Sequence, residues 1–351
     1  CGSNYETILD KYYQYDDSLH NELTNLRAKI NNLEDLKNFS NETKSLEKKI
    51  TIFHAEVVKK ILKEKDVEID FIGFHGQTIY HNADKRISKQ LGDGKLLSQL
   101  SRKKVINDFR KNDIKNGGQG APLTPLFHSM LACKFNLVPS IILNIGGIIN
   151  ATTISENGSF LATDIGPGMC LIDKWIRLKS KKRYDENGDI AALGKISSNL
   201  DLELDKFYYT KKNDPKKNYI KSFDISDFDI SFVHGLSLED GAATLTEYTA
   251  KIIFHYFLYI IEMTKNTNNN PIIILCGGGR KNNFLVERLK INFKNYNIVK
   301  MIDDYGIDGD FVESQAFGYL AVNSYLKLPI SFPDTTGCKE PSTGGVLVEN
   351  Y

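Results

Sequence analysis

The stretch Ser140-Ile141-Ile142-Leu143-Asn144-Ile145-Gly146-Gly147 decides the fold class, because it joins a strand to a glycine turn. Its β-branched run is typical of a strand that is buried on both faces, as in parallel sheets. Two strands follow after short turns, Ile149 to Ile154 and Phe160 to Thr163, and predict a β-meander. Another apolar run, Pro271 to Cys276, predicts a buried strand that precedes a helix from Asn283. Strands interleaved with helices in this way indicate an α/β fold.

Glycines close three of the predicted strands. They are Gly146-Gly147, Gly277-Gly278-Gly279, and the Gly73 and Gly76 pair around the end of the strand from Val67 to Phe74. One such turn usually reflects turn geometry alone. Three of them at strand ends favour a nucleotide or another phosphorylated ligand, because ligands of open α/β sheets bind beyond the carboxyl ends of strands and glycine amides can cradle phosphates. The sequence has no GxxxxGK[ST] motif and no GxGxxG after a strand, so the two commonest nucleotide folds are not indicated.

The periodicity of apolar residues predicts helices in the rest of the chain, within residues 18–65 and over 123–134, 238–257 and 311–326. Further strands are expected at residues 5–9 and 104–109, and loops among short helices at residues 180–235. Each half of the chain is therefore predicted to carry a meander of strands, followed by helices and further strands. The length of 351 residues fits two domains, at roughly 150 residues per domain.

The composition is that of an ordinary folded protein, with 41% hydrophobic and 25% charged residues. Lysine and arginine total 45 and aspartate and glutamate 44, which gives a formal net charge of +1. This balance argues against binding of nucleic acid by bulk electrostatics, which needs a clear basic excess. A local cationic pocket for phosphate stays compatible with it. No window approaches ~20 apolar residues free of charge, so no membrane span is expected.

Five cysteines are scattered without a CxxC pair: Cys1, Cys133, Cys170, Cys276 and Cys338. An odd, dispersed set in a chain of this length indicates reduced thiols and a cytoplasmic location. The chain begins with Cys1 and nothing like a signal peptide follows. One interpretation is a lipoprotein cysteine exposed by signal cleavage; the interpretation favoured here is a fragment whose true beginning is absent.

Asp164 is the most prominent candidate for chemistry, because it follows the third strand of the predicted meander. Ile165-Gly166-Pro167-Gly168 come next and are predicted to open a helix. A carboxylate in this place could act as a general base or hold a metal through water. It could also cap the helix by accepting hydrogen bonds from its first amides, and both roles can hold at once.

The first half of the chain contributes neutral and charged candidates. Gln77 and Thr78 follow His75-Gly76 and offer donors and acceptors suited to sugar hydroxyls, whereas a single histidine such as His75 is more often structural. Asp108 and Arg110 would face the same side of an extended segment, and such a pair is more often a structural ion pair. Arg110 could nevertheless bind an anionic group of a substrate.

Several motifs occur in one order and are specific when taken together. They are His75-Gly76-Gln77-Thr78, Asp108-Phe109-Arg110 followed by Gly117 to Leu123, Leu143 to Gly147, Asp164 to Gly168 and Cys276 to Gly279. This set resembles the motifs of the anhydro-N-acetylmuramic acid kinases, which are bacterial enzymes of cell-wall recycling. The similarity runs from about residue 8 to residue 349.

The resemblance implies the sugar kinase/Hsp70/actin fold, in which two α/β lobes of duplicated ribonuclease H-like type enclose a ligand cleft. The lobes would span residues 1–137 and 138–310, with residues 311–351 returning toward the first lobe. The implied reaction uses ATP to phosphorylate the 6-oxygen of 1,6-anhydro-N-acetylmuramic acid while water opens the anhydro ring. Its products would be N-acetylmuramic acid 6-phosphate and ADP. Mg²⁺ would bridge the β- and γ-phosphates, and a homodimer would follow the family tendency.

The matched motifs also imply residue roles. Asp164 matches the family's general base, which would deprotonate the water that attacks the anomeric carbon. The substrate-site positions are Gln77, Thr78, Arg110 and Glu313, the last of which lies early in a predicted helix. The backbone that would wrap the phosphates and adenosine is that of Gly146, Gly147, Gly277, Gly278 and Gly279. No residue is assigned as a protein ligand of a metal.

Some positions depart from the family pattern. Family members begin with a strand and a Met-Ser-Gly-Thr-Ser-x-Asp-Gly phosphate loop, so we expect about twenty residues, two strands and their turn, to be missing before Cys1. Without them, the chain as given is expected to show little or no kinase activity. The stretch Pro215 to Lys221 keeps only the first two residues of the family's Pro-Lys-Ser-Thr-Gly-Arg-Glu, and Met169 stands where asparagine is usual. Two alternatives therefore stay open: a relic that binds sugar or nucleotide without turnover, and a kinase of another amino sugar.

Overall fold

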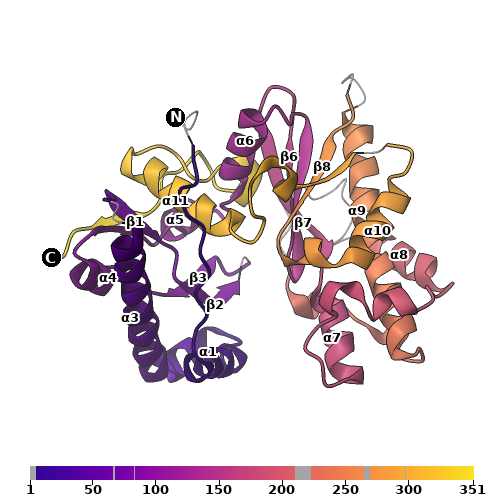
Figure 1. Cartoon of the computed structure of the whole chain (residues 1–351), viewed down its shortest axis with the longest axis horizontal. Helices are drawn as coiled ribbons and strands as arrows, with labels where there is room; N and C mark the ends of the chain where they lie inside the picture. The colour runs from indigo at the N-terminus through magenta and orange to yellow at the C-terminus, as the bar shows by residue number, and fades with distance from the viewer. Residues whose placement is uncertain (1–4, 66–67, 83, 210–222, 265–268, 297) are drawn as a thin grey trace. The chain divides into compact units, whose positions relative to one another are not determined.

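The computed structural model describes residues 5–65, 68–82, 84–209, 223–264, 269–296 and 298–351, and these form two compact units (Figure 1). The central unit comprises His128–Val312, and the terminal unit comprises the residues up to Phe127 together with Glu313–Tyr351. The divisions fall inside α6 (Pro125–Lys134) and at the start of α11 (Val312–Tyr325). The domain limits expected from the sequence, after residues 137 and 310, remain a prediction.

A five-stranded sheet lies in the central unit, in the order β7-β6-β5-β8-β9. Its strands are β5 (Ser140–Ile145), β6 (Ile148–Ile154), β7 (Phe160–Pro167), β8 (Ile272–Cys276) and β9 (Val299–Met301). The first three form an antiparallel meander, β8 is parallel to β5, and β9 is parallel to β8. This order is that of a ribonuclease H-like sheet, which confirms the α/β fold class. Because β5, β7, β8 and β9 run in one direction, their carboxyl ends lie at one edge of the sheet.

The helices of the central unit bury their apolar faces in one large core that includes β5, β7 and β8. They are α7 (Cys170–Lys179), α8 (Leu200–Tyr209), α9 (Leu238–Met263) and α10 (Asn283–Asn292), with α9 and α10 side by side (Figure 1). Ser237 caps α9 by accepting a hydrogen bond from the Asp240 amide. The buried indole of Trp175 donates to the Leu238 carbonyl at 2.9 Å. Only glycine fits at Gly241, because a Cβ there would lie 2.3 Å from the Trp175 ring.

The terminal unit contains two small sheets. In the first, β4 (Lys104–Asn107) lies between a parallel partner, β1 (Phe71–Phe74), and an antiparallel one, β10 (Val346–Val348). The second is the hairpin of β2 (Gln77–Asn82) and β3 (Ile87–Leu91). The meander expected in the first half of the chain is absent from the described residues, where a parallel pair and a separate hairpin are found instead.

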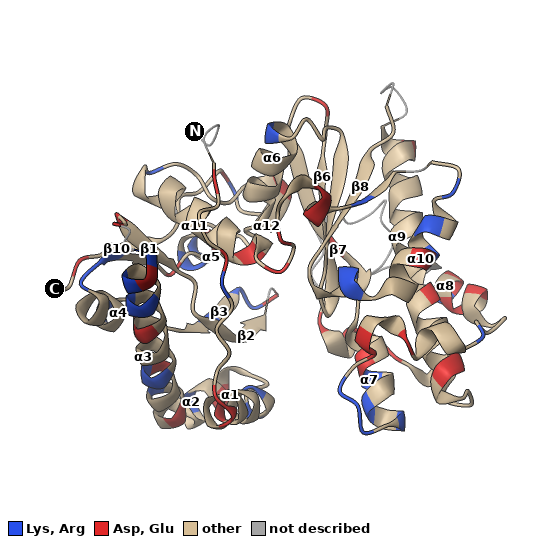
Figure 2. Cartoon of the chain, viewed as in Figure 1, with Lys and Arg blue, Asp and Glu red and all other residues tan. Residues whose placement is uncertain are grey.

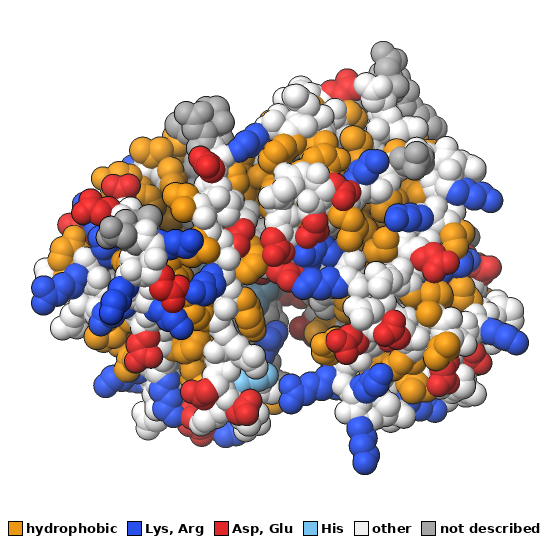
Figure 3. Space-filling model, in the orientation of Figure 1, with side chains coloured by type: hydrophobic (Ala, Val, Ile, Leu, Met, Phe, Trp, Pro, Cys, Tyr) orange, Lys and Arg blue, Asp and Glu red, His pale blue; other side chains and the backbone are white. Residues whose placement is uncertain are grey.

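Helices surround these sheets: α1 (Asp17–Lys29), α2 (Leu33–Asn38), α3 (Ser40–Lys65), α4 (Gly94–Ser101), α5 (Lys111–Lys115) and α12 (Pro333–Thr336). Charged residues of both signs recur along α3 (Figure 2), and two of them pair with α1, Glu42 with Lys29 at 3.0 Å and Lys49 with Glu22 at 2.7 Å. On the visible surface of each unit, basic and acidic side chains are interspersed (Figure 3), in line with the net charge of +1.

Three predicted elements need correction. Residues 5–9 form no strand; Ile8 is 78% exposed, so this apolar run is not paired into a sheet. The strand that begins at Lys104 ends at Asn107, because Asp108 takes a left-handed conformation with a φ of 60°. Strand β7 continues to Pro167, so Asp164 lies inside a strand and does not open a helix.

The structure describes only some of the residues at which the sequence departs from the family pattern. Cys1 and the stretch from Pro215 to Lys221 lie outside the described residues. Met169 is the residue at which α7 begins, in the cap position. Among the helices in the described ranges, none is both long and apolar enough to cross a membrane.

Candidate active site

Two of the predicted glycine turns leave the same edge of the central sheet. Gly146-Gly147 follow β5 and Gly277–Gly279 follow β8, and these strands are parallel neighbours in which Asn144 pairs with Cys276. Gly277 has a φ of 78°, and a Cβ there would lie 2.3 Å from the Asn144 Oδ1. The chain therefore needs glycine at this position, both for the backbone conformation and for the close approach of the two turns.

The turn after β5 also anchors the start of α7. The Gly146 carbonyl accepts the Met169 amide at 2.9 Å, and the Gly147 carbonyl accepts the amides of Gly168 at 2.9 Å and Cys170 at 3.2 Å. With these carbonyls engaged, the turn and the helix start form one connected backbone region. Gly147 is exposed, as is Gly278, where an added Cβ would meet nothing within 4 Å. A ligand can therefore approach the backbone at both turns.

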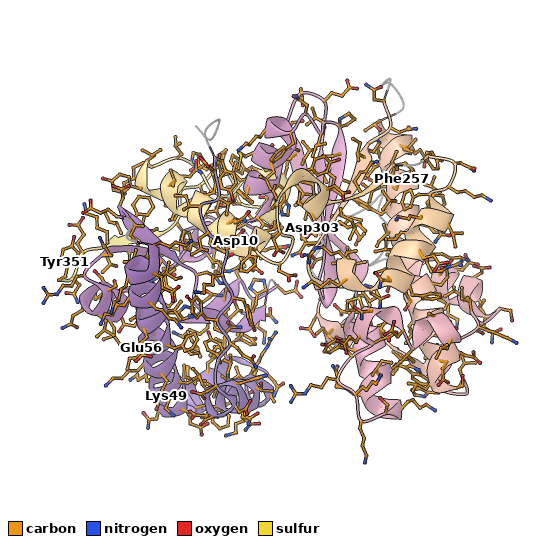
Figure 4. The ribbon with its side chains drawn as sticks, viewed as in Figure 1. Asp10, Lys49, Glu56, Phe257, Asp303 and Tyr351 are labelled. Atoms are coloured by element: carbon orange, nitrogen blue, oxygen red, sulfur yellow. The ribbon has the colours of Figure 1, made fainter. Side chains whose placement is uncertain are left out.

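Arg280 holds the turn after β8 in place. Its Nη1 donates to the Gly277 carbonyl at 3.1 Å, and its guanidinium forms ion pairs with Asp303 at 2.8 Å, Asp310 at 2.6 Å and Asp308 at 3.2 Å. Asp303 is labelled in Figure 4. The hydrogen bond with Asp303 is the largest of the effects that raise the pKa of Arg280. With its donors used by three carboxylates and one carbonyl, Arg280 has a structural role at the turn.

Asp164 lies near the end of β7 and is half-buried. Its Oδ1 accepts a hydrogen bond from the Asn150 Nδ2 at 3.0 Å, and its Oδ2 accepts one from the Phe223 amide at 3.0 Å. Burial raises the pKa of the Asp164 carboxyl, and the two hydrogen bonds act in the opposite direction. Both donors are neutral. The effect of burial is larger than theirs, so the pKa of the carboxylate is raised and it is a stronger base. This is the arrangement that a general base needs.

Arg110 is the charged centre of the terminal unit's candidate residues. Its Nε donates to the His75 Nε2 at 3.1 Å and its Nη1 donates to the Gly120 carbonyl at 2.7 Å. Phe317 lies against both side chains, 4.1 Å from the His75 ring between centroids and 5.9 Å from the Arg110 Cζ. Burial lowers the pKa of Arg110, and Glu313 and then Asp113 oppose this shift. The guanidinium is held mainly by neutral acceptors.

His75 is fixed in one tautomer by these contacts. Its Nε2 must accept from Arg110, so its Nδ1 carries the proton and donates to the Gly76 carbonyl at 2.9 Å. Burial first, and then the Arg110 charge, lower the pKa of His75 to about 3. The ring therefore stays neutral at physiological pH and presents a lone pair to Arg110.

The remaining substrate-site candidates lie in the same unit. Gln77 and Thr78 begin β2, directly after His75-Gly76, and the Thr78 hydroxyl accepts from the Gln90 Nε2 at 3.1 Å. Glu313 is exposed in the first turn of α11 and acts on Arg110 electrostatically. The structure thus joins Arg110 to His75 directly and to Glu313 through its charge. Within the described part of the chain, Gln77 forms no hydrogen bond with Arg110.

The predicted pairing of Asp108 with Arg110 is wrong. Asp108 forms its ion pair with Lys111 at 3.3 Å, and the left-handed backbone at Asp108 removes the extended geometry on which the prediction depended. Sequence reasoning also missed Asn150 and Arg280. Arg280 could have been noticed as the cation that follows three glycines, whereas Asn150 gives no local signal. Among the described residues, no group of three or more His, Cys, Asp or Glu side chains could hold a metal ion.

The ribonuclease H-like sheet, with glycine turns at its carboxyl edge, places the chain in the sugar kinase/Hsp70/actin class of α/β proteins. Within that class, it belongs to the anhydro-N-acetylmuramic acid kinase family, whose family model matches residues 2–350.

Curated relatives agree with this assignment. The chain is 51% identical to the anhydro-N-acetylmuramic acid kinase of Pelagibacter ubique, over 99% of this chain and 92% of the relative. It is 40% identical to the enzyme of the same name from Agrobacterium fabrum, over 86% of this chain and 80% of the relative. A solved structure, the activator of the 2-hydroxyisocaproyl-CoA dehydratase from Clostridium difficile with bound ADPNP, is distantly similar, with a TM-score of 0.32 and 14% identity over 54% of this chain and 64% of that one.

Proposed function

We propose that this protein uses ATP to phosphorylate 1,6-anhydro-N-acetylmuramic acid while water opens the anhydro bridge, yielding N-acetylmuramic acid 6-phosphate and ADP. Family membership and the 51% identity to a kinase of this name support the substrate and the reaction class. The single structural observation that carries the chemistry is the Asp164 carboxylate, held by two neutral donors in a partly buried place that raises its pKa.

Asp164 would act as the general base. It takes a proton from a water molecule, whose oxygen forms the new bond to C1 of the sugar. The bond between C1 and the bridge oxygen breaks, and that oxygen, still attached to C6, attacks the γ-phosphorus of ATP. ADP leaves, and the proton on Asp164 passes to solvent. One carboxylate thus serves both hydrolysis of the bridge and phosphoryl transfer, since the first step creates the nucleophile for the second.

The nucleotide would lie at the carboxyl edge of the central sheet, against the backbone of Gly146, Gly147 and Gly277–Gly279. Exposed glycine backbone at two adjacent turns supports this assignment, because it can approach phosphates without steric hindrance. Mg²⁺ carried by the β- and γ-phosphates would offset their charge toward the attacking oxygen. The described residues contain no cluster that could bind a metal ion by itself, which fits an ion held largely by the nucleotide.

The remaining candidates for sugar binding lie in the terminal unit. Arg110 is suited to an anionic group, because it is half-buried and its described hydrogen-bond partners, His75 and Gly120, are neutral. Gln77 and Thr78 would bind hydroxyl or amide groups, and Glu313 would accept from the sugar in the same region. These assignments, like the homodimer, rest on family resemblance, whereas the cytoplasmic location rests on the dispersed cysteines.

Mass spectrometry of the reaction products tests the proposal. Purified full-length protein with ATP, Mg²⁺ and the anhydro sugar should release ADP and convert the sugar to a product heavier by one phosphoryl group and one water. The same assay with N-acetylglucosamine and its anhydro form separates this function from a kinase of another amino sugar. If the protein binds nucleotide but releases no ADP in the presence of any of these sugars, a relic that binds without turnover would be supported instead.

A further inference from the structure

Three polar side chains lie in one row across the meander of the central sheet. In the pairing of the strands, Asn150 of β6 is opposite Asn144 of β5 on one side and opposite Asp164 of β7 on the other. Residues that are directly opposite in a sheet point to the same face. The next positions of this face, Ile142, Thr152 and Ala162, are all buried. Along this face of the sheet, the fully buried side chains therefore end at this row, where polar side chains begin.

The backbone is irregular where the row meets β7. The register of β6 against β7 shifts between Ile149 and Asn150, so that Ile149 pairs with Gly166 and Asn150 with Asp164. Such bulges redirect side chains and are over-represented beside active sites. Here the shift leaves Asn150 opposite Asp164, with its Nδ2 3.0 Å from the Asp164 Oδ1.

The orientation of the Asn150 amide is set by Asp164. A carboxylate oxygen accepts hydrogen bonds and cannot donate them, so the amide must turn its nitrogen toward Asp164. Its oxygen then has no hydrogen-bond partner among the described residues, although it is buried. Buried polar atoms without partners are unfavourable, and stability alone would favour an apolar or β-branched residue here, as at Ala151 and Thr152 on the same strand.

We propose that Asn150 is a positioning residue, which holds the Asp164 carboxylate in the orientation used for proton abstraction. The inference rests on the proposed function, in which Asp164 is the base. The amide is a neutral donor, so it orients the carboxylate without adding a cation that would reduce its basicity. An arginine or lysine in its place would hold the carboxylate equally well but would make it a poorer base.

The surroundings of Asp164 make this contact measurable. From β6 it meets Asn150, and from the segment that begins at residue 223 it meets the Phe223 amide. Helix α9 packs on the end of β7 through Thr249 and Ile252, which do not titrate. Burial raises the pKa of Asp164, and the hydrogen bond from Asn150 is the largest effect that lowers it. Loss of this donor should therefore raise the pKa further.

The test compares two variants, Asn150→Leu and Thr152→Val. Leucine has nearly the same shape as asparagine but cannot donate a hydrogen bond. The control removes a buried hydrogen bond to His128 (2.8 Å) two residues along the same strand and does not touch Asp164. In Asn150→Leu we expect kcat to fall on the order of 10- to 100-fold, which is part of the roughly 10²- to 10⁴-fold that a general base contributes. The KM values for sugar and ATP should stay within about threefold. The acid limb of the kcat profile should move to higher pH, and in Asn150→Asp, which adds a like charge, it should move further.

A second readout does not depend on turnover. The carboxyl titration of Asp164, followed by carbon NMR in aspartate-labelled protein and assigned with Asp164→Asn, should move to higher pH in Asn150→Leu and stay unchanged in Thr152→Val. If the full-length wild-type protein shows no kinase activity but this shift is seen, the proposed function fails and the positioning contact stands. An unchanged titration, or a kcat of wild-type size in Asn150→Leu, would overturn the inference. So would a loss of activity matched by an equal loss of thermal stability in both variants.

Discussion

Arg110 and Arg280 are two arginines of this protein whose direct hydrogen-bond partners differ. The Arg280 side chain is 5% exposed and forms ion pairs with Asp303, Asp308 and Asp310. Its interactions with Asp303 and Asp310 raise its pKa. Arg110 donates to a neutral imidazole and to a carbonyl, and burial lowers its pKa. A guanidinium already neutralised by carboxylates serves the fold, whereas one held by neutral groups keeps its charge for a ligand.

Asp164 resembles Arg110 in having neutral partners, although its charge is negative. Its described partners are an amide side chain and a backbone amide, and its pKa is raised. Asp164 and Arg110 are thus charged groups whose direct hydrogen-bond partners are neutral. The following predictions test this contrast, from the largest expected effect to the smallest.

Replacement of the base should have the largest effect. Asp164→Asn keeps the size of the side chain but removes proton abstraction, so kcat should fall by roughly 10³-fold in a coupled ADP-release assay. Asp201→Asn is the matched control, because the Asp201 side chain is 77% exposed and pairs only with Lys251 among the described residues. Wild-type turnover in Asp164→Asn would remove this residue from the mechanism.

Arg110→Gln should reduce activity without a matching loss of stability. The guanidinium is held by neutral groups, so we expect kcat/KM for the sugar to fall about 100-fold, with a higher KM. The free energy of unfolding should change by about 1–2 kcal/mol, because the hydrogen bonds to His75 and Gly120 are weakened but no tight ion pair is broken. Urea denaturation beside sugar kinetics measures both. A large loss of stability with normal kinetics would show that Arg110 belongs with Arg280.

Arg280→Gln should show the reverse pattern. It leaves three aspartates facing one another and removes the donor to the Gly277 carbonyl. We expect a loss of about 2–3 kcal/mol in the free energy of unfolding, less than for a fully buried pair because the three aspartate side chains are 38–49% exposed. Lys281→Gln, which removes one exposed ion pair of Asp310, is the control and should cost under about 1 kcal/mol. Equal stability of the two variants would contradict the structural role of Arg280.

The neutral state of His75 gives the smallest predicted effect. Its pKa of about 3 lies below the ordinary value of 6.5, so the unfolded chain binds a proton that the folded chain does not. Stability from this residue is present above about pH 6.5 and is lost as the pH falls toward 3. Between pH 6.5 and pH 5, the free energy of unfolding should therefore fall by about 1–2 kcal/mol less in His75→Gln than in the wild type. Parallel curves for the two proteins would show that His75 takes up its proton as readily in the folded chain as in the unfolded chain.

Local patterns predicted much of the fold but few of the contacts. The strands from Ser140 to Ile145 and from Pro271 to Cys276, with their glycine turns, were evident from composition and periodicity, and the structure has them as β5 and β8. The length of β7 was underestimated, because Gly166 and Pro167 suggest a turn although both belong to the strand.

The site could be predicted by residue type but not by partner. Asn150 and Asp164 are 14 residues apart and meet only because of the register shift between β6 and β7, which no sequence pattern reveals. His75 and Arg110 are 35 residues apart and meet beyond the ends of the parallel strands β1 and β4. The predicted neighbour of Arg110, Asp108, was wrong because one left-handed residue changes the direction of the chain. Contacts of this kind depend on tertiary geometry.

The central claim, that water attacks C1 while the bridge oxygen receives the phosphoryl group, is tested most directly with water enriched in the heavy oxygen isotope. The reaction with ATP, Mg²⁺ and 1,6-anhydro-N-acetylmuramic acid is run in this water, and the product is fragmented by mass spectrometry at early times. The label should appear in the C1 hydroxyl and be absent from the phosphate ester. Label in the transferred phosphate, or a phosphorylated product that still holds its anhydro ring, would contradict the account.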